Sequence, residues 1–194
     1  AAGTISLLGS SGVTTVNSNA STAAATFTNI ASTDVALKAT STDQNATYTF
    51  TSTAVSGSSD SATLTLSNVT AGTQTIAGIE TLNIVSSTGP NALTTLTAAA
   101  ATTINVSGSQ TLDLGTFNAV ATTISAADAT AGLTVISNNS SAATVTGGSG
   151  NDVVTFTENT AASNKFVGGA GDDKVTFTAN LATTDSASGG AGTD

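Results

Sequence analysis

The stretch GGSGNDVVT at residues 147–155 recurs as GGAGDDKVT at 168–176, and GGAGTD at 189–194 supplies the first six positions of a third copy. Both full copies read G-G-x-G-x-D-x-U-x, where U is a large aliphatic residue, and the copies begin 21 residues apart. Glycine at three of the first four positions lets the backbone adopt positive φ and turn its carbonyl oxygens toward one point. A repeat of this length with strand-like texture predicts a β-solenoid, in which each coil is one rung.

Apolar residues repeat with the same period along the chain, in three columns whose members are 19 to 21 residues apart. We therefore expect an all-β fold: a right-handed parallel β-solenoid, or β-roll, with rungs of about 20–21 residues over 61–194. The columns should lie inside, with Ser and Thr outside. They are Leu64, Ile84, Ile104, Ile124, Val145 and Phe166; Ile76, Leu96, Phe117, Ile136, Phe156 and Phe177; and Leu93, Leu114, Leu133, Val154 and Val175.

Residues 1–60 form a less regular β segment. Residues 46–51 and 62–66 alternate apolar and polar side chains, and residues 56–60 between them are rich in Ser and Gly. This pattern is typical of a β-hairpin. The segment is either a small antiparallel sheet that leads into the solenoid or a set of coils with insertions, and the sequence leaves both open.

The composition supports strands and disfavours several functions. Of 194 residues, 25 are Ser and 41 are Thr, and the β-branched Thr fits a pleated surface. The net charge is −9, the only cations are Lys38, Lys165 and Lys174, and the chain lacks Arg, His and Cys. Nucleic-acid binding, Ser-His-Asp or Cys-His catalysis and zinc sites built on Cys or His therefore lack the residues they need. We expect no catalytic activity, and we read Asp113 and Asp128 as turn or surface residues.

The absence of Cys and Met favours a protein exported to assemble outside the cell. We find no signal-peptide pattern and no apolar run long enough to span a bilayer. Because residue 1 is not Met and the chain stops inside the third motif copy, we expect it to be a piece of a longer protein.

The glycine motifs have the chemistry of a calcium site. Calcium prefers six to eight oxygen ligands at roughly 2.3–2.6 Å, more than one loop supplies. Two loops stacked about 4.8 Å apart can share an ion, because each offers carbonyl oxygens and one carboxylate. Without calcium the stacked aspartates would repel one another, so we expect metal binding and folding to be coupled.

Two successive calcium sites follow from this stacking. One lies between Asp152 and Asp173, the other between Asp173 and Asp194, with Asn151 and Asp172 as extra donors. The full predicted ligand set is Gly147, Ser149, Asn151, Asp152, Gly168, Gly169, Ala170, Gly171, Asp172, Asp173, Gly190, Gly192 and Asp194.

The nonapeptide resembles the calcium-binding repeat of the RTX family. This resemblance implies a parallel β-roll, type I secretion from a Gram-negative cell, and folding outside the cell where calcium is plentiful. One feature departs from the family pattern: the motif alternates with 12-residue stretches, 156–167 and 177–188, that lack Gly-Gly. Only one edge of the solenoid should therefore hold calcium.

A second resemblance comes from IAGIETLNI at residues 76–84. It is similar to the G-[IV]-E-T-[LI]-N segments of type I-secreted bacterial surface-layer (S-layer) proteins, although Glu80 by itself reads as a solvated turn residue. The resemblance implies an S-layer subunit fragment that self-assembles into a lattice on the cell surface. The implied partners are other copies and the outer cell surface, with lipopolysaccharide a candidate reached through other parts of the parent chain.

Two alternatives to the lattice protein remain open. The first alternative is a stalk segment of a large RTX adhesin, where a rigid solenoid holds a distal binding domain away from the cell. The chain is also readable as a calcium-binding accessory domain of a secreted enzyme whose catalytic domain lies elsewhere.

Overall fold

The computed structural model describes residues 2–118, 121–138, 141–157, 163–178 and 181–194. Over these residues the chain winds into a β-solenoid of about eight turns, built from parallel strands and turns without a helix. The all-β parallel solenoid predicted from the repeat is thereby confirmed. Within the same ranges, no helix long and apolar enough to cross a bilayer is found.

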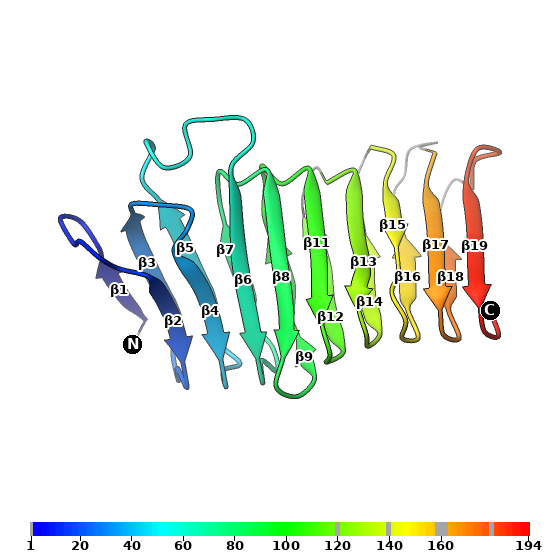
Figure 1. Cartoon of the computed structure of the whole chain (residues 1–194), viewed down its shortest axis with the longest axis horizontal. Coiled ribbons are helices and arrows are strands. Elements are labelled where there is room, and N and C mark those ends of the chain that lie inside the picture. The colour runs from blue at the N-terminus through cyan, green and yellow to red at the C-terminus, as the bar shows by residue number, and fades with distance from the viewer. Residues whose placement is uncertain (1, 119–120, 139–140, 158–162, 179–180) are drawn as a thin grey trace.

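Two parallel sheets face each other across the core, and the chain alternates between them as it advances along the rod (Figure 1). Sheet A contains β1 (Gly3–Ser6), β3 (Ala25–Ile30), β5 (Ala46–Phe50), β7 (Thr73–Ile76), β9 (Asn91–Ala92), β10 (Thr95–Thr97), β12 (Leu112–Asn118), β14 (Leu133–Ser137), β16 (Val153–Phe156) and β18 (Lys174–Phe177). Sheet B contains β2 (Thr15–Asn19), β4 (Ala36–Thr40), β6 (Ser61–Ser67), β8 (Thr81–Ser87), β11 (Thr103–Gly108), β13 (Thr123–Ala129), β15 (Thr144–Thr146), β17 (Lys165–Ala170) and β19 (Ser186–Ala191).

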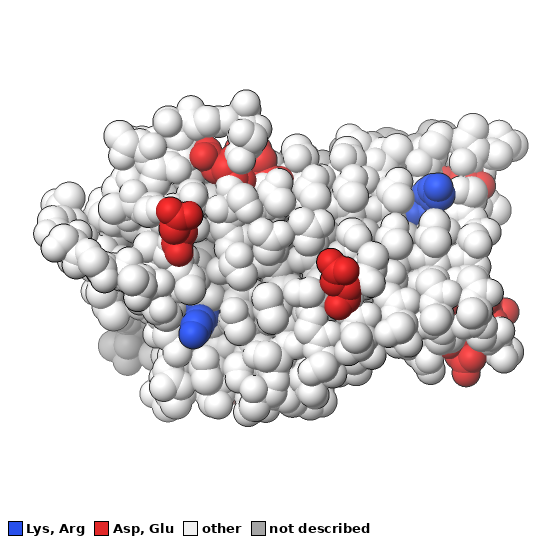
Figure 2. All heavy atoms as spheres, in the orientation of Figure 1, with Lys and Arg blue, Asp and Glu red and all other residues white. Residues whose placement is uncertain are grey.

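The core fills the narrow space between the sheets. Along β6 and β8 every second side chain is buried, which is the period of a strand with one face inside. The predicted interior columns are confirmed as buried up to the last rung, with Ile136 the exception, and Val175 and Phe177 are half-buried near the C-terminal end. The outer face of sheet B carries few charges (Figure 2).

The predicted register is wrong at one step in the first column. Ile104 pairs with Leu82, and Ile84 pairs with Val106 rather than with Ile104. The rung is longer here, as the 22-residue separation of the hydrogen-bonded Asn83 and Asn105 shows. Apolar side chains two residues apart point to the same face, so the periodicity alone could not choose between the two registers.

The other columns slip for similar reasons, most visibly at Ile136, which is 38% exposed. The register of β12 on β14 shifts between Asp113 and Thr116, where Gly115 has a φ of 60°. The shift places Ser137, not Ile136, beside Phe117 in the core. A β-bulge reverses the faces of the residues that follow it, so the prediction that Ile136 is internal was wrong.

The N-terminal residues belong to the same coil. β5 pairs with β3 and β7, and β6 pairs with β4 and β8, all in parallel. The predicted hairpin is therefore wrong, because its two strands lie in different sheets. Residues 51–60 instead form a loop that projects from the edge of the rod (Figure 1), so the alternative of coils with insertions is the correct one.

An aromatic stack with a polar contact lies in these first rungs. Tyr48 on β5 is fully buried, its ring stacks on Phe27 at 5.5 Å, and its hydroxyl donates to the Lys38 carbonyl of sheet B at 2.6 Å. Burial raises the pKa of the Tyr48 hydroxyl well above its ordinary value. The hydroxyl thus joins the two sheets through the core.

Candidate metal centre

The three glycine motifs stack in register at one edge of the solenoid, where strands of sheet B turn toward sheet A. Gly169 pairs with Gly190 and Ala170 with Ala191 across neighbouring rungs. The N–H of Ala170 also donates to the Gly148 carbonyl at 3.0 Å. The copies therefore lie one above another in the solenoid, as predicted.

The motif aspartates continue a column of the core instead of pointing into solvent. Thr134 pairs with Val153, and Val153 pairs with Lys174. Asp152 therefore lies in the stack between Leu133 of the preceding rung and Asp173 of the following rung. Asp152 is completely buried and Asp173 is 6% exposed, whereas Asp194 at the open end is exposed. A carboxylate in such a position needs hydrogen-bond donors or a cation.

Backbone amides supply the first set of donors. Leu133 N–H donates to Asp152 Oδ1 at 2.7 Å, and Asp152 N–H donates to Asp173 Oδ1 at 2.8 Å. Asp173 N–H then donates to Asp194 Oδ1 at 3.1 Å. Each carboxylate thus accepts the amide of the preceding rung, and these charge-assisted bonds offset part of the repulsion between the stacked aspartates.

The second carboxylate oxygens differ between the copies. Asp152 Oδ2 accepts the N–H of Gly148 at 2.8 Å. Asp173 Oδ2 is buried and has no hydrogen-bond partner among the described residues. A Cβ added at Gly168 would collide with this oxygen and with the Gly189 carbonyl oxygen, so only glycine leaves room for the two groups.

A cavity of about 280 Å³ lies next to Asp173 at the C-terminal end of the rod. Its lining comprises Asp173, Gly189 and Asp194 together with Phe166, Lys174, Val175 and Ala187. Among the described residues no three Asp, Glu, His or Cys side chains converge, so carbonyl or water oxygens would have to complete a coordination shell. This oxygen-only donor set, with an unpartnered carboxylate oxygen, fits calcium.

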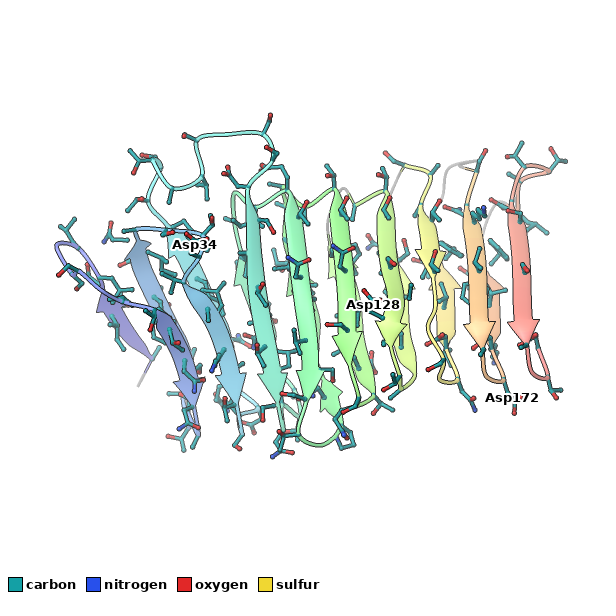
Figure 3. All side chains as sticks on the ribbon, viewed as in Figure 1. Asp34, Asp128 and Asp172 are labelled. Carbon is teal, nitrogen blue, oxygen red and sulfur yellow. The ribbon has the colours of Figure 1, made fainter. Side chains whose placement is uncertain are left out.

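The proposed extra donors lie apart from this cavity. Asn151 and Asp172 are exposed, and Asp172 sits at the rim of its turn (Figure 3). Asn151 Oδ1 accepts the N–H of Asp172 at 2.9 Å, and Asp172 Oδ1 accepts the N–H of Thr193 at 2.9 Å. The two side chains therefore form a second, outer ladder to the backbone, separate from the inner aspartates.

The remaining predicted residues pack the turns against one another. Ser149 donates its N–H to the Ala129 carbonyl at 3.1 Å, so the first copy rests on a rung that has no Gly-Gly turn. The other positions bring backbone into close contact with the neighbouring rung: Gly147 N–H donates to Val167, Gly171 N–H donates to Ala191, and a Cβ at Gly190 or Gly192 would meet the carbonyl oxygen of Gly169 or Gly171.

At the opposite edge, side-chain oxygens also accept backbone amides of the preceding rung, and the glycine motif did not predict these residues. Asn164 Oδ1 accepts the N–H of Ala143 at 3.0 Å, and Asp185 Oδ1 accepts the N–H of Asn164 at 2.7 Å. Asp185 Oδ2 accepts the N–H of Ala182 at 2.8 Å, which leaves neither oxygen of this carboxylate unbonded. Asn164 and Asp185 are 21 residues apart, which is also the spacing of the motif copies, and this recurrence could have predicted this ladder. Parts of the Gly-poor stretches on this edge, 158–162 and 179–180, lie outside the described residues.

Three other acids were read from the sequence as turn or surface residues. Asp128 is exposed, so its reading as a surface residue is confirmed. Asp113 is half-buried on β12, where its Oδ1 accepts the N–H of Gly115 at 2.8 Å. Glu80 is half-buried, and its Oε2 accepts the N–H of Asp60 at 2.9 Å. Glu80 lies in the bend before β8, as the reading as a turn residue requires, but it is not fully solvated, because it holds the projecting loop to the next rung.

The electrostatics of the aspartate column are asymmetric. Burial raises the pKa of Asp152, the amides of Leu133 and Gly148 lower it in part, and the charge of Asp173 raises it further. The unpartnered oxygen lies one rung further on, at Asp173. The carboxylate oxygen that a cation can bind without displacing a hydrogen bond is therefore that of Asp173.

Comparison with known proteins adds no further constraint on this site. No protein-family model, curated protein or solved structure matches the chain. The interpretation therefore depends on the geometry of the aspartate column and on the motif itself.

Proposed function

We propose that the chain is a calcium-dependent structural segment of an extracellular surface assembly, and that its rungs at 147–194 hold the calcium. The observation that carries the proposal is Asp173 Oδ2, a buried carboxylate oxygen without a partner beside the Gly189 carbonyl and Asp194. Such an oxygen is costly to bury, and a cation removes that cost. The resemblance of the motif to the RTX repeat supports calcium as the cation.

Calcium would act on the folding of these rungs. Asp173 and Asp194 would bind it through their second oxygens, and the Gly189 carbonyl would contribute a third ligand. Because the whole chain carries 12 acidic residues and only 3 Lys, the positive charge that balances the column has to come from outside. With few protein ligands, we expect a dissociation constant of about 10⁻⁴–10⁻³ M, as in other extracellular modules. Such a site stays empty in the cytosol and fills outside the cell.

Assembly of several copies is the second part of the proposal. The support for this part is the resemblance of residues 76–84 to segments of surface-layer proteins. Lattice neighbours of the same kind are the proposed partners, with the outer cell surface and lipopolysaccharide contacted by other parts of a longer chain.

A stalk is the alternative that one observation favours. The two ends of the chain lie at opposite ends of a rod with a continuous core (Figure 1). A rod of this kind fixes the separation of the domains at its two ends and needs no lateral contact to do so. In the stalk reading calcium stiffens the rod but does not cause association.

The experiment is a calcium titration followed by circular dichroism and light scattering. Wild type should gain β-structure with calcium and lose it with a chelator, and Asp173→Ala should need much more calcium. Asp128→Ala is the matched control, because Asp128 is an exposed acid on β13. Growth in particle size with calcium supports the lattice, and a monodisperse rod supports the stalk. Retention of all structure in chelator, or an unchanged calcium affinity in Asp173→Ala, would refute calcium-dependent folding.

A further inference from the structure

The first and second motif copies differ in structure more than in sequence. This difference bears on how many calcium ions the proposed site binds, so the inference drawn from it rests on the proposed function. Asp152 has both carboxylate oxygens occupied, Oδ1 by Leu133 N–H at 2.7 Å and Oδ2 by Gly148 N–H at 2.8 Å. Asp173 has only Oδ1 occupied, although it is nearly as buried.

The backbone of the turns accounts for the difference. In the second copy Gly169 and Gly171 have φ of 111° and 127°, and the corresponding glycines of the third copy are also at positive φ. Gly148 and Gly150 of the first copy are not among the positive-φ glycines. In the first copy the Gly148 N–H reaches its own aspartate, and no such bond to Asp173 forms in the second copy.

The rung beneath the first copy explains why its turn takes the other form. The column that holds Asp152 is continued on that side by the apolar Leu133 and Leu112. A Cβ at Gly150 would collide with the backbone of Ala131 and Gly132, which belong to a rung without a Gly-Gly turn. The first copy therefore packs against an ordinary apolar rung, and its carboxylate accepts one amide from that rung and one from its own turn.

A calcium ion between the first and second copies would need Asp152 Oδ2 as a ligand. The ion would compete for that oxygen with the half-buried Gly148 N–H, which already donates to it at 2.8 Å. An ion between the second and third copies displaces nothing, because Asp173 Oδ2 has no donor. We infer that the chain binds a single calcium ion, between the second and third copies, and that Asp152 is a structural anion that joins the apolar rungs to the calcium rung.

The stoichiometry of calcium binding tests this inference on the full chain. Isothermal titration with calcium chloride should give one equivalent. Asp173→Asn should weaken binding by about tenfold or more, because it removes a charged ligand. Asp152→Asn should change the dissociation constant by less than about threefold, as expected for a charge that lies outside the shell and is partly screened. Asp128→Asn is the control for loss of an exposed charge.

Backbone amide NMR spectra of the wild type provide a readout that needs no variant to fold. Calcium should shift the resonances of residues 168–194 and leave those of Leu133 and Gly148 in place. Two equivalents of calcium, a large loss of affinity in Asp152→Asn, or a calcium-dependent shift of Gly148 would overturn the single-site inference while leaving the proposed function intact. The absence of calcium binding at about 10 mM, well above the range of extracellular modules, would instead overturn both.

Discussion

Tyr48 illustrates how one side chain can hold two sheets together. Its ring stacks on Phe27 within sheet A, and its hydroxyl is committed to a carbonyl of sheet B. Tyr48 is fully buried and Lys38 is half-buried, so the hydroxyl in particular cannot turn to water if the bond is lost. The strength of the contact is therefore set by desolvation of the carbonyl as well as by the bond itself.

Replacement of Tyr48 by Phe keeps the ring and removes only this bond. We expect the free energy of unfolding to fall by about 1–2 kcal/mol, because the Lys38 carbonyl is left without that donor. Urea denaturation followed by circular dichroism measures the change. Thr49→Val, an exposed change on the same strand, should alter stability by less than about 0.5 kcal/mol. Equal stability of Tyr48→Phe and wild type would show that the bond contributes nothing.

Asp152 makes stability depend on pH in a direction unusual for an acid. Its pKa in the folded chain is raised above the ordinary value of 3.8, so the folded state holds its proton more tightly than the unfolded state does. The stabilisation from the protonated form is complete below 3.8 and is lost as pH rises through the raised folded pKa. In calcium-free buffer, this residue should therefore lower the melting temperature as pH increases across that window.

The comparison of wild type with Asp152→Asn isolates this contribution from the other acids. We expect the melting temperature of the wild type, relative to the variant, to decrease from pH 3.5 to pH 7, since only the wild type acquires the buried charge. A difference that stays constant with pH, or that grows in favour of the wild type, would contradict the sign of the shift.

Asn91 holds the connection between two strands, β8 and β9, in place. Its Oδ1 accepts the N–H of Val69 at 2.9 Å, and its Nδ2 donates to Ser86 Oγ at 2.8 Å and to the carbonyls of Ser87 and Gly89. One buried amide thus fixes the connection from β8 to β9 and attaches it to the rung before. Leu112 lies next to it in the same column, so an apolar residue of similar size is accommodated there.

Asn91→Leu should nevertheless be strongly destabilising. The leucine would fill the column, but the Val69 N–H and the turn carbonyls would lose their partner, and we expect a loss of about 2–4 kcal/mol. Chemical denaturation provides the measurement. Asn105→Thr on the exposed face of β11 is the matched control and should be nearly neutral. If Asn91→Leu is as stable as the wild type, packing rather than hydrogen bonding holds this turn.

The stacking of the rungs could be predicted from the sequence, whereas the exact register of the strands could not. The spacing of Leu64, Ile84 and their successors was enough to predict a stacked solenoid, because each rung must bury the same face. The register at Ile136 and Ile104 was not predictable, since bulges and longer rungs change it by one or two residues without altering the composition. The motif placed Asp173 and Asp194 together, but hydrogen bonding decides which aspartate has a free oxygen, and the letters of the two copies do not encode it.

The whole molecule behaves as a stack in which each rung contacts only its neighbours. Because order in such a stack is lost locally, calcium removal should loosen the rungs nearest the ion first. We expect hydrogen exchange in chelator to increase in β17, β18 and β19 and to remain slow in β6, β8 and β11. Mass spectrometry of peptides from the full chain measures both regions at once. A uniform increase along the chain would indicate that the solenoid opens as a single cooperative unit instead.

The position of the chain ends has a mechanical consequence. They leave the rod at opposite ends (Figure 1), so a pulling force applied between them peels one coil from the stack before it loads the next. A coil with the 21-residue repeat of the motif aspartates would release about 70 Å of contour length at roughly 3.3–3.6 Å per residue. Force spectroscopy should record a series of nearly equal extensions, with a longer one where residues 51–60 are inserted, and a single large rupture would contradict this. Under tension the rod would lengthen in small steps and dissipate work, while the coils furthest from the load stay folded.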